Sequence, residues 1–147
     1  MFDKDRLNHS LAVANKMVEI GENLNLKESD LQDLFILGYN HDIGYDFCSD
    51  KKEHNIVGGE ILKNNGYKYW KEVYYHGRLT REYSSQYLDI LNCADMQIDK
   101  YGNDVGFEKR LEDIKSRYGE ESEVYLKCAQ LVEYLKNKVL AEKDFER

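Results

Sequence analysis

Apolar residues recur at spacings of three and four along almost the whole chain, which is the periodicity of amphipathic α-helices. In the first such segment the apolar stripe consists of Leu7, Leu11, Ala14 and Val18. No stretch shows the sustained alternation of apolar and polar residues that predicts a β-strand. The pattern therefore predicts an all-α fold.

Capping residues and glycines divide the pattern into seven helices. The predicted helices cover about residues 5–22, 29–42, 53–64, 68–76, 83–99, 106–118 and 121–141. Ser29 is predicted to cap the second helix, because Asp30 and Asp33 follow it in a favourable first turn. Residues 44–52 are predicted to form a loop, and residues 101–103 a turn.

The chain contains no proline, no linker-like segment and no internal repeat. A chain of 147 residues can bury about 70% of its unfolded surface in one core, without metal or disulfide. We therefore expect a single domain over residues 1–147, with a core bundle over about 5–100 and C-terminal helices over about 106–141. A bound metal ion would then serve function rather than folding.

Charge and cysteine content exclude several classes of protein. A net charge of −7 argues against binding to nucleic-acid polymers. No apolar run approaches the roughly 20 residues that span a bilayer, and the N-terminus lacks the apolar core of a signal peptide, so a cytoplasmic protein is expected. Cys48, Cys93 and Cys128 are odd in number and form no CxxC pair, which predicts reduced packing residues.

The charge is unevenly distributed along the chain. Residues 1–50 contain ten acidic and four basic residues, whereas residues 63–81 contain five basic residues and only Glu72 as an acid. The five are Lys63, Lys68, Lys71, Arg78 and Arg81. Such a segment is either a solvated face or the rim of a cleft that attracts phosphates.

Histidine and aspartate carry the candidate chemistry. The histidines of the chain are His9, His41, His54 and His76, and Asp42 follows His41 directly. Imidazole nitrogens and carboxylate oxygens together suit iron, manganese, zinc or nickel better than calcium or magnesium. An adjacent His-Asp pair at a helix end can direct two ligands at one ion or place a bridging carboxylate between two ions.

The order of these residues, His9, His41-Asp42, His54, His76 and Asp95, resembles the HD-domain superfamily of metal-dependent phosphohydrolases over roughly residues 5–100. The resemblance implies an all-helical bundle in which the first helix provides His9, the second His41 and Asp42, and the fifth Asp95. His54 and His76 resemble the additional histidines of the subset that holds two metals. Within that subset the pattern is closer to bacterial hydrolases of symmetrical dinucleoside tetraphosphates than to cyclic-dinucleotide phosphodiesterases.

The resemblance implies a water activated by metal as the nucleophile. In a two-ion scheme His9, His41, Asp42 and Asp95 hold the first ion, and Asp42 bridges to a second ion held by His54 and His76. With a single ion, His54 or His76 becomes a candidate general acid for the leaving oxygen. The expected cofactor is one or two divalent transition-metal ions, iron or manganese first, with nickel, cobalt, zinc or magnesium as alternatives.

Basic residues beside two of the histidines are candidate substrate contacts: Lys51, Lys52, Arg78 and Arg81. Each of the four could instead be solvated surface. Several aromatic residues could stack on a base or pack in the core, namely Tyr39, Tyr45, Trp70, Tyr74 and Tyr75. The segment 107–119 resembles the C-terminal part of small bacterial HD proteins and is expected to pack over the bundle.

One position departs from the family pattern, because Tyr45 stands where many relatives carry lysine or glutamate. The leading prediction is a phosphohydrolase that acts on a nucleotide or another small phosphorylated metabolite, as a monomer or homodimer. The alternative is a non-catalytic, metal-containing HD module that senses a nucleotide or docks a protein partner. A lyase or oxygenase is a third possibility, since a di-iron site can also activate oxygen.

Overall fold

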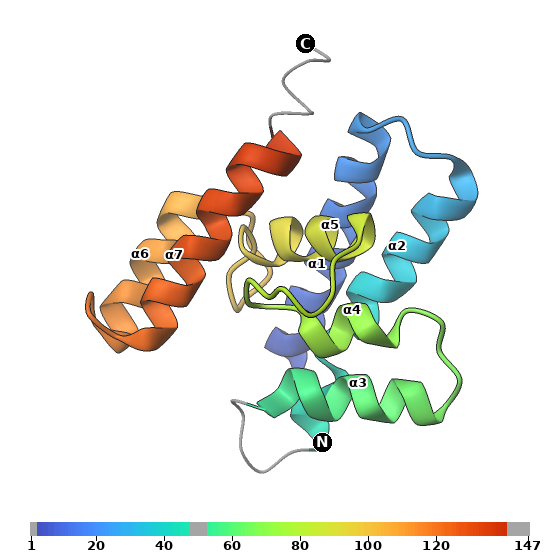
Figure 1. Ribbon diagram of the computed structural model, residues 1–147, viewed down its shortest axis with the longest axis horizontal. Helices are drawn as coiled ribbons and strands as arrows, with labels where there is room; N and C mark the ends of the chain where they lie inside the picture. The colour runs from blue at the N-terminus through green and yellow to red at the C-terminus, as the bar shows by residue number, and fades with distance from the viewer. Residues whose placement is uncertain (1–2, 48–52, 141–147) are drawn as a thin grey trace.

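The computed structural model describes residues 3–47 and 53–140, which form an arrangement of helices (Figure 1). The α-helices are α1 (Lys4–Asn23), α2 (Glu28–Asn40), α3 (His54–Asn64), α4 (Trp70–Tyr75), α5 (Gln86–Asp95), α6 (Gly106–Tyr118) and α7 (Glu123–Leu135). A 3-10 helix, η1 (Ile43–Asp46), follows α2, and a π-helical segment, η3 (Lys136–Leu140), extends α7. Within the described ranges, β-type pairing is limited to one isolated bridge between Ile98 and Asp104, so the prediction of an all-α fold is confirmed.

The helices pack as neighbouring pairs around α5 (Figure 1). Helix α1 packs against both α2 and α5, α3 packs against α4 and η1, and α6 pairs with α7. Helix α7 in turn contacts α5, which joins the C-terminal pair to the rest of the molecule. None of the described helices is long and apolar enough to cross a bilayer.

The hydrophobic core lies around α5, where α1, α2 and α7 pack against it, and its largest fully buried side chains include Met17, Leu34, Leu37, Leu91 and Leu135. On α1 the buried apolar face runs through Val13, Ala14, Met17 and Ile20. The predicted stripe of this helix is therefore correct only at Ala14, since Leu7, Leu11 and Val18 are partly exposed. Because α1 packs against both α2 and α5, the face of the helix that is buried differs from the predicted one.

Helices α1 and α2 approach closely at Gly38. A Cβ atom at this position would lie 2.6 Å from the Ala14 Cα and 2.9 Å from the Ala14 nitrogen. We expect Gly38→Ala to lower the free energy of unfolding by about 1–3 kcal/mol, because the two helices must separate. Urea denaturation measures the change, with Ser29→Ala at an exposed position of α2 as a control expected to stay within about 0.5 kcal/mol. Wild-type stability of Gly38→Ala would contradict this close approach.

The predicted Ser29 cap of α2 is wrong. The helix begins at Glu28, and the N-cap is Lys27, whose carbonyl accepts hydrogen bonds from the backbone N–H groups of Asp30 (2.9 Å) and Leu31 (3.1 Å). Asn25 adopts a positive φ of 60°, which makes the turn after α1 tight enough for α2 to begin before Ser29. The second helix also ends earlier than predicted, so that His41 is its C-cap.

Helix α5 is shorter at both ends than the predicted helix 83–99. Before the helix, the hydroxyl groups of Tyr83 and Ser85 donate to the buried carboxylate of Glu72 on α4 at 2.6 Å and 2.7 Å. After the helix, Asp99 Oδ1 accepts hydrogen bonds from the backbone N–H groups of Tyr101 and Asn103, both at 2.9 Å. The Ser85 hydroxyl oxygen also accepts a hydrogen bond from the backbone N–H of Leu88 at 3.0 Å and caps the start of the helix. The bonds to Asp99 hold the backbone that follows the helix in a turn.

The cysteines agree with the prediction where the structure describes them. Cys93 is buried in the hydrophobic core, and Cys128 is half-buried and packs against that core. Cys48 lies outside the described residues, as does most of the predicted loop 44–52. The first part of that loop, residues 44–46, belongs instead to the 3-10 helix η1 (Ile43–Asp46).

Candidate metal centre

The ends of five helices bring the six predicted metal ligands together. His9 lies in the second turn of α1, His41 caps the C-terminus of α2, and Asp42 precedes η1. His54 is the first residue of α3, His76 caps the C-terminus of α4, and Asp95 is the last residue of α5. Because most of these positions are helix termini, the side chains can converge without interrupting a helix.

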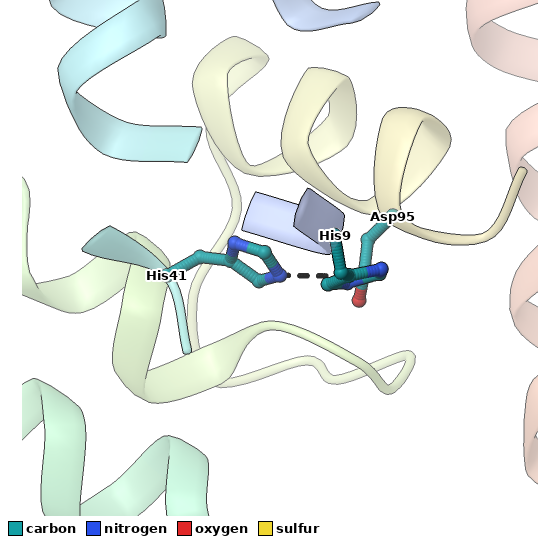
Figure 2. Close-up of side chains that lie close together, drawn as sticks. All are labelled: His9, His41 and Asp95. Atoms are coloured by element: carbon teal, nitrogen blue, oxygen red, sulfur yellow. Dashed lines mark hydrogen bonds and ion pairs between the residues drawn. The ribbon is translucent and has the colours of Figure 1, made fainter. Parts of the chain in front are cut away.

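One group of ligands consists of His9, His41 and Asp95, which point toward one another from three helices (Figure 2). His9 Nε2 lies 2.9 Å from Asp95 Oδ1, and His41 Nε2 lies 3.4 Å from the same oxygen. Each residue offers one ligand atom within 4.8 Å of the others. All three side chains are buried.

Asp42 lies between this group and the other two histidines. Its Oδ2 atom is 3.2 Å from His41 Nε2 and 3.5 Å from His9 Nε2. Its Oδ1 atom is 3.3 Å from His54 Nε2 and 3.6 Å from His76 Nε2. The two oxygens of one carboxylate thus face two different pairs of imidazoles, which is the arrangement expected of a carboxylate between two ions.

Backbone carbonyl groups orient three of the imidazole rings. The Nδ1 atoms of His9, His41 and His76 lie 2.8, 2.6 and 2.5 Å from the carbonyl oxygens of Asp99, Gly38 and Val73 respectively. A carbonyl oxygen only accepts, so each Nδ1 atom carries a proton and each Nε2 atom is left to face the carboxylates. This is how proteins commonly orient histidines that ligate metals.

The His41 imidazole fits a metal ion particularly well. Its Nε2 atom is buried and has no hydrogen-bond partner of acceptable geometry within the described part of the chain. A buried nitrogen without a partner is unfavourable unless something occupies the coordination direction of its lone pair. A divalent cation between His41 and the two aspartates meets this requirement, and the mixed nitrogen and oxygen donor set suits a transition metal.

The buried histidines and aspartates of the cluster shift the pKa values of one another. Burial, the largest single influence, raises the pKa of Asp42 and of Asp95, but His41 and the neighbouring histidines together outweigh it, so both pKa values lie well below the usual range. Burial alone lowers the pKa of His41, and the two carboxylates raise it well above its usual value. Two ionised carboxylates in a buried cluster therefore need compensating positive charge, which protons or a metal ion can supply.

Polar side chains support the segment that carries His76. Asn55 Nδ2 donates to the carbonyl oxygen of Tyr74 at 2.8 Å, and Asn92 Oδ1 accepts from the backbone N–H of Gly77 at 2.8 Å. Both asparagines are buried. They fix the backbone on either side of His76 and thereby position its ring.

Tyr45, the residue that departs from the family pattern, packs directly against the cluster. Its ring stacks on that of His54 with centroids 4.1 Å apart and planes inclined by 12°. Burial, together with the negative charges of Asp42 and Asp95, raises the pKa of the Tyr45 hydroxyl far above neutrality. Tyr45 therefore presents a neutral hydroxyl group beside the cluster.

The cluster opens into a cleft of about 490 Å³. Four of its described lining residues are basic: Arg6, Lys100, Arg110 and Arg117. The predicted substrate contacts Arg78 and Arg81 are not among the described residues that line it, and Lys51 and Lys52 lie outside the described residues. Among the five aromatic candidates, only Tyr45 lines the cleft.

The basic residues of the cleft were not identified from the sequence, although the spacing of the arginines in the sequence indicated them. Arg6 precedes His9 by about one helical turn. Arg110, Ile114 and Arg117 follow one another at intervals of four and three, so they share one face of α6. The prediction favoured basic residues that are close to the histidines in sequence, whereas α6 reaches the cleft only through tertiary packing.

The chain matches the model of a known protein family. The family model described as the HD domain matches residues 6–138. No curated protein and no solved structure matches the chain. The match extends well beyond the ligand-bearing segment and includes α6 and α7.

Proposed function

Because the chain belongs to the HD-domain family, whose members are generally hydrolases, we propose that it is a metal-dependent phosphohydrolase. Its substrate is a nucleotide or another small phosphorylated metabolite. The observation that carries this proposal is the position of Asp42, whose two oxygens face two pairs of imidazoles. A cleft of about 490 Å³ suits a small molecule rather than a polymer.

The residues divide into two overlapping ligand sets. His9, His41, Asp42 and Asp95 would hold one ion, and Asp42, His54 and His76 would hold a second. Iron or manganese is the proposed occupant, because both accept a mixed set of imidazoles and carboxylates. A divalent ion at this position supplies an activated water and positive charge for the phosphoryl oxygens.

Hydrolysis forms a bond between the water oxygen and phosphorus and breaks the bond between phosphorus and the leaving oxygen. One proton of the water is released to the surroundings, and the leaving oxygen gains a proton. His54 is the most exposed histidine of the cluster, with 20% of its side chain accessible, and faces the cleft. If one ion binds, His54 or His76 is suited to hold the proton for the leaving oxygen.

Tyr45 favours a second candidate function. A neutral hydroxyl stacked on His54 cannot replace a charged lysine or glutamate in phosphate binding or proton transfer. A non-catalytic HD module would bind metal and a nucleotide, or a protein partner, without turnover. The two functions differ in one measurable property, the hydrolysis of a bound phosphate compound.

Metal removal and reconstitution test the proposal. We expect protein purified without chelator to contain about one or two equivalents of iron or manganese and to hydrolyse phosphoesters or phosphoanhydrides. Chelation is expected to abolish this activity and to lower the melting temperature, since a ligand of the folded state stabilises it. Readdition of manganese, iron, cobalt, nickel, zinc or magnesium, one at a time, identifies the active ion.

The outcomes separate the two candidate functions. Hydrolysis that is lost with the metal and returns with it supports the phosphohydrolase. Metal-loaded protein that binds nucleotides tightly but never hydrolyses them supports the non-catalytic module. Protein that neither contains nor takes up metal contradicts both.

A further inference from the structure

Helix α6 lines the cleft with two arginines that the proposed reaction does not use. Arg110, Ile114 and Arg117 all contribute to the cleft wall from one face of the helix. Arg110 is half-buried, whereas Arg117 is exposed. Resting on the proposed function, we propose that Arg110 and Arg117 bind a second phosphate group of the substrate, away from the phosphoryl group that is hydrolysed.

The first argument is that Arg110 lacks a partner it needs. Its Nε atom is buried and makes no hydrogen bond within the described part of the chain. Burial of an N–H donor without an acceptor is unfavourable, and more so for a charged group. A phosphate oxygen in the cleft would supply the missing acceptor, and a guanidinium group can bind it through two parallel N–H groups.

The second argument is a contrast with another arginine of the same cleft. Arg6 lies 3.2 Å from an oxygen of Asp46 and 3.7 Å from an oxygen of Asp3, so carboxylates already compensate its charge. Neither Arg110 nor Arg117 forms an ion pair with any carboxylate among residues 3–47 and 53–140. In a chain with 28 acidic residues, two uncompensated arginines in one cleft indicate a site for an external anion.

The third argument is proximity to the metal-ligand cluster. Cys128 on α7 also lines the cleft, and its surroundings include both Arg110 and Asp95. Arg110 also lines this cleft of about 490 Å³ together with the ligands Asp42 and Asp95. A single small molecule in the cleft can therefore contact the cluster and Arg110 together.

A nucleotide-sized substrate with two phosphates fits the chemistry of the cleft. Two guanidinium charges match a phosphate dianion better than the single charge of a carboxylate. Tyr101 and Tyr118 line the same cleft and are 53% and 54% exposed, so both have surface available for stacking on a base. Arg117 lies over the Tyr118 ring, with its Cζ atom 5.9 Å from the ring centroid, so the proposed phosphate site lies next to the proposed base-stacking surface.

Steady-state kinetics with matched probes test this inference. Full-length protein loaded with manganese is assayed with p-nitrophenyl phosphate, AMP, ADP and adenosine 3′,5′-bisphosphate. We expect Arg110→Gln to raise KM for at least one of the two-phosphate probes by about ten- to hundredfold, the effect of one or two charge-assisted hydrogen bonds. Its effect on kcat is expected to be small, because Arg110 contacts the distant phosphate.

Further variants distinguish a specific site from general attraction by positive charge. Lys109→Gln removes a charge from an exposed position of α6 outside the cleft and is expected to leave every KM unchanged. Arg110→Lys retains the charge but loses the bidentate geometry and is expected to recover only part of the affinity. Arg117→Gln is expected to resemble Arg110→Gln with a smaller effect, because Arg117 is exposed.

Calorimetric binding of adenosine 3′,5′-bisphosphate provides a readout that does not require turnover. Weaker binding to Arg110→Gln than to wild type and to Lys109→Gln supports the anion site, even if no probe is hydrolysed and the proposed function fails. Hydrolysis by the wild type, with the same KM and affinity in Arg110→Gln, overturns the anion site and leaves the phosphohydrolase intact. Equal effects of Lys109→Gln and Arg110→Gln also overturn it.

Discussion

Replacement of Asp42 by alanine is expected to abolish metal binding and to reduce hydrolysis by on the order of 1,000-fold or more, since metal ions supply several kcal/mol of charge stabilisation in such reactions. The physical reason is that Asp42 faces both pairs of imidazoles, at 3.2 and 3.5 Å on one side and 3.3 and 3.6 Å on the other. Elemental analysis and assay of the same preparation measure the two effects together.

Two further variants make the Asp42 result interpretable. Asp42→Ala leaves buried histidines without their carboxylate, which by analogy with broken buried ion pairs costs about 3–5 kcal/mol and threatens folding. Asp42→Asn keeps the size of the side chain but removes its charge, so loss of metal in a folded Asp42→Asn protein reports on ligation itself. Glu60→Ala removes an exposed carboxylate on α3 outside the cleft and is the control for net charge.

One result would contradict the proposed role of Asp42 as the carboxylate between the two ions. Folded Asp42→Asn protein with wild-type metal content and activity would show that this carboxylate does not bridge the ions. Circular dichroism of each variant distinguishes lost ligation from lost structure.

Gly44→Ala is expected to be the most damaging glycine substitution in the chain. A Cβ atom at this position would lie 1.8 Å from the carbonyl oxygen of His54 and 2.7 Å from the nitrogen of Gly58. Both atoms belong to the backbone of α3, so η1 and α3 must move apart. We expect a loss of about 3 kcal/mol or more in the free energy of unfolding, and a lower metal content because His54 moves with α3.

Alanine substitutions on the two sides of the contact between Gly44 and Gly58 check this prediction. A Cβ atom at Gly58 would lie 3.0 Å from the nitrogen of Gly44, so Gly58→Ala faces the same neighbour with more space. Urea denaturation is expected to rank the stabilities as wild type, then Gly58→Ala, then Gly44→Ala. Equal stability of the two variants would mean that the contact between η1 and α3 yields easily and does not position His54.

The sequence alone determined the fold class and identified the candidate metal ligands that lie together in the structure. Helical periodicity depends on side chains three and four positions apart, and this local information was sufficient to predict α1, α3, α6 and the start of α2 to within two residues. Four histidines and Asp42 were recognisable because histidine is rare in this chain and Asp42 follows His41 directly, whereas Asp95 was identified through the resemblance to the HD-domain superfamily. Their chemistry depends on residue type, which the sequence states directly.

Tertiary structure decided which residues share the cleft with those ligands. Arg78 is close to His76 in sequence but does not line the cleft, whereas Arg110 is far from every histidine in sequence and does. The backbone after α5 is likewise held in a turn by hydrogen bonds to Asp99, which periodicity does not record. Helix α6 packs on α7, which packs on α5, so the face of α6 that lines the cleft depends on a contact between segments distant in sequence. Local patterns therefore specify the helices and the ligand types, and only the packing of distant helices specifies the walls of the site.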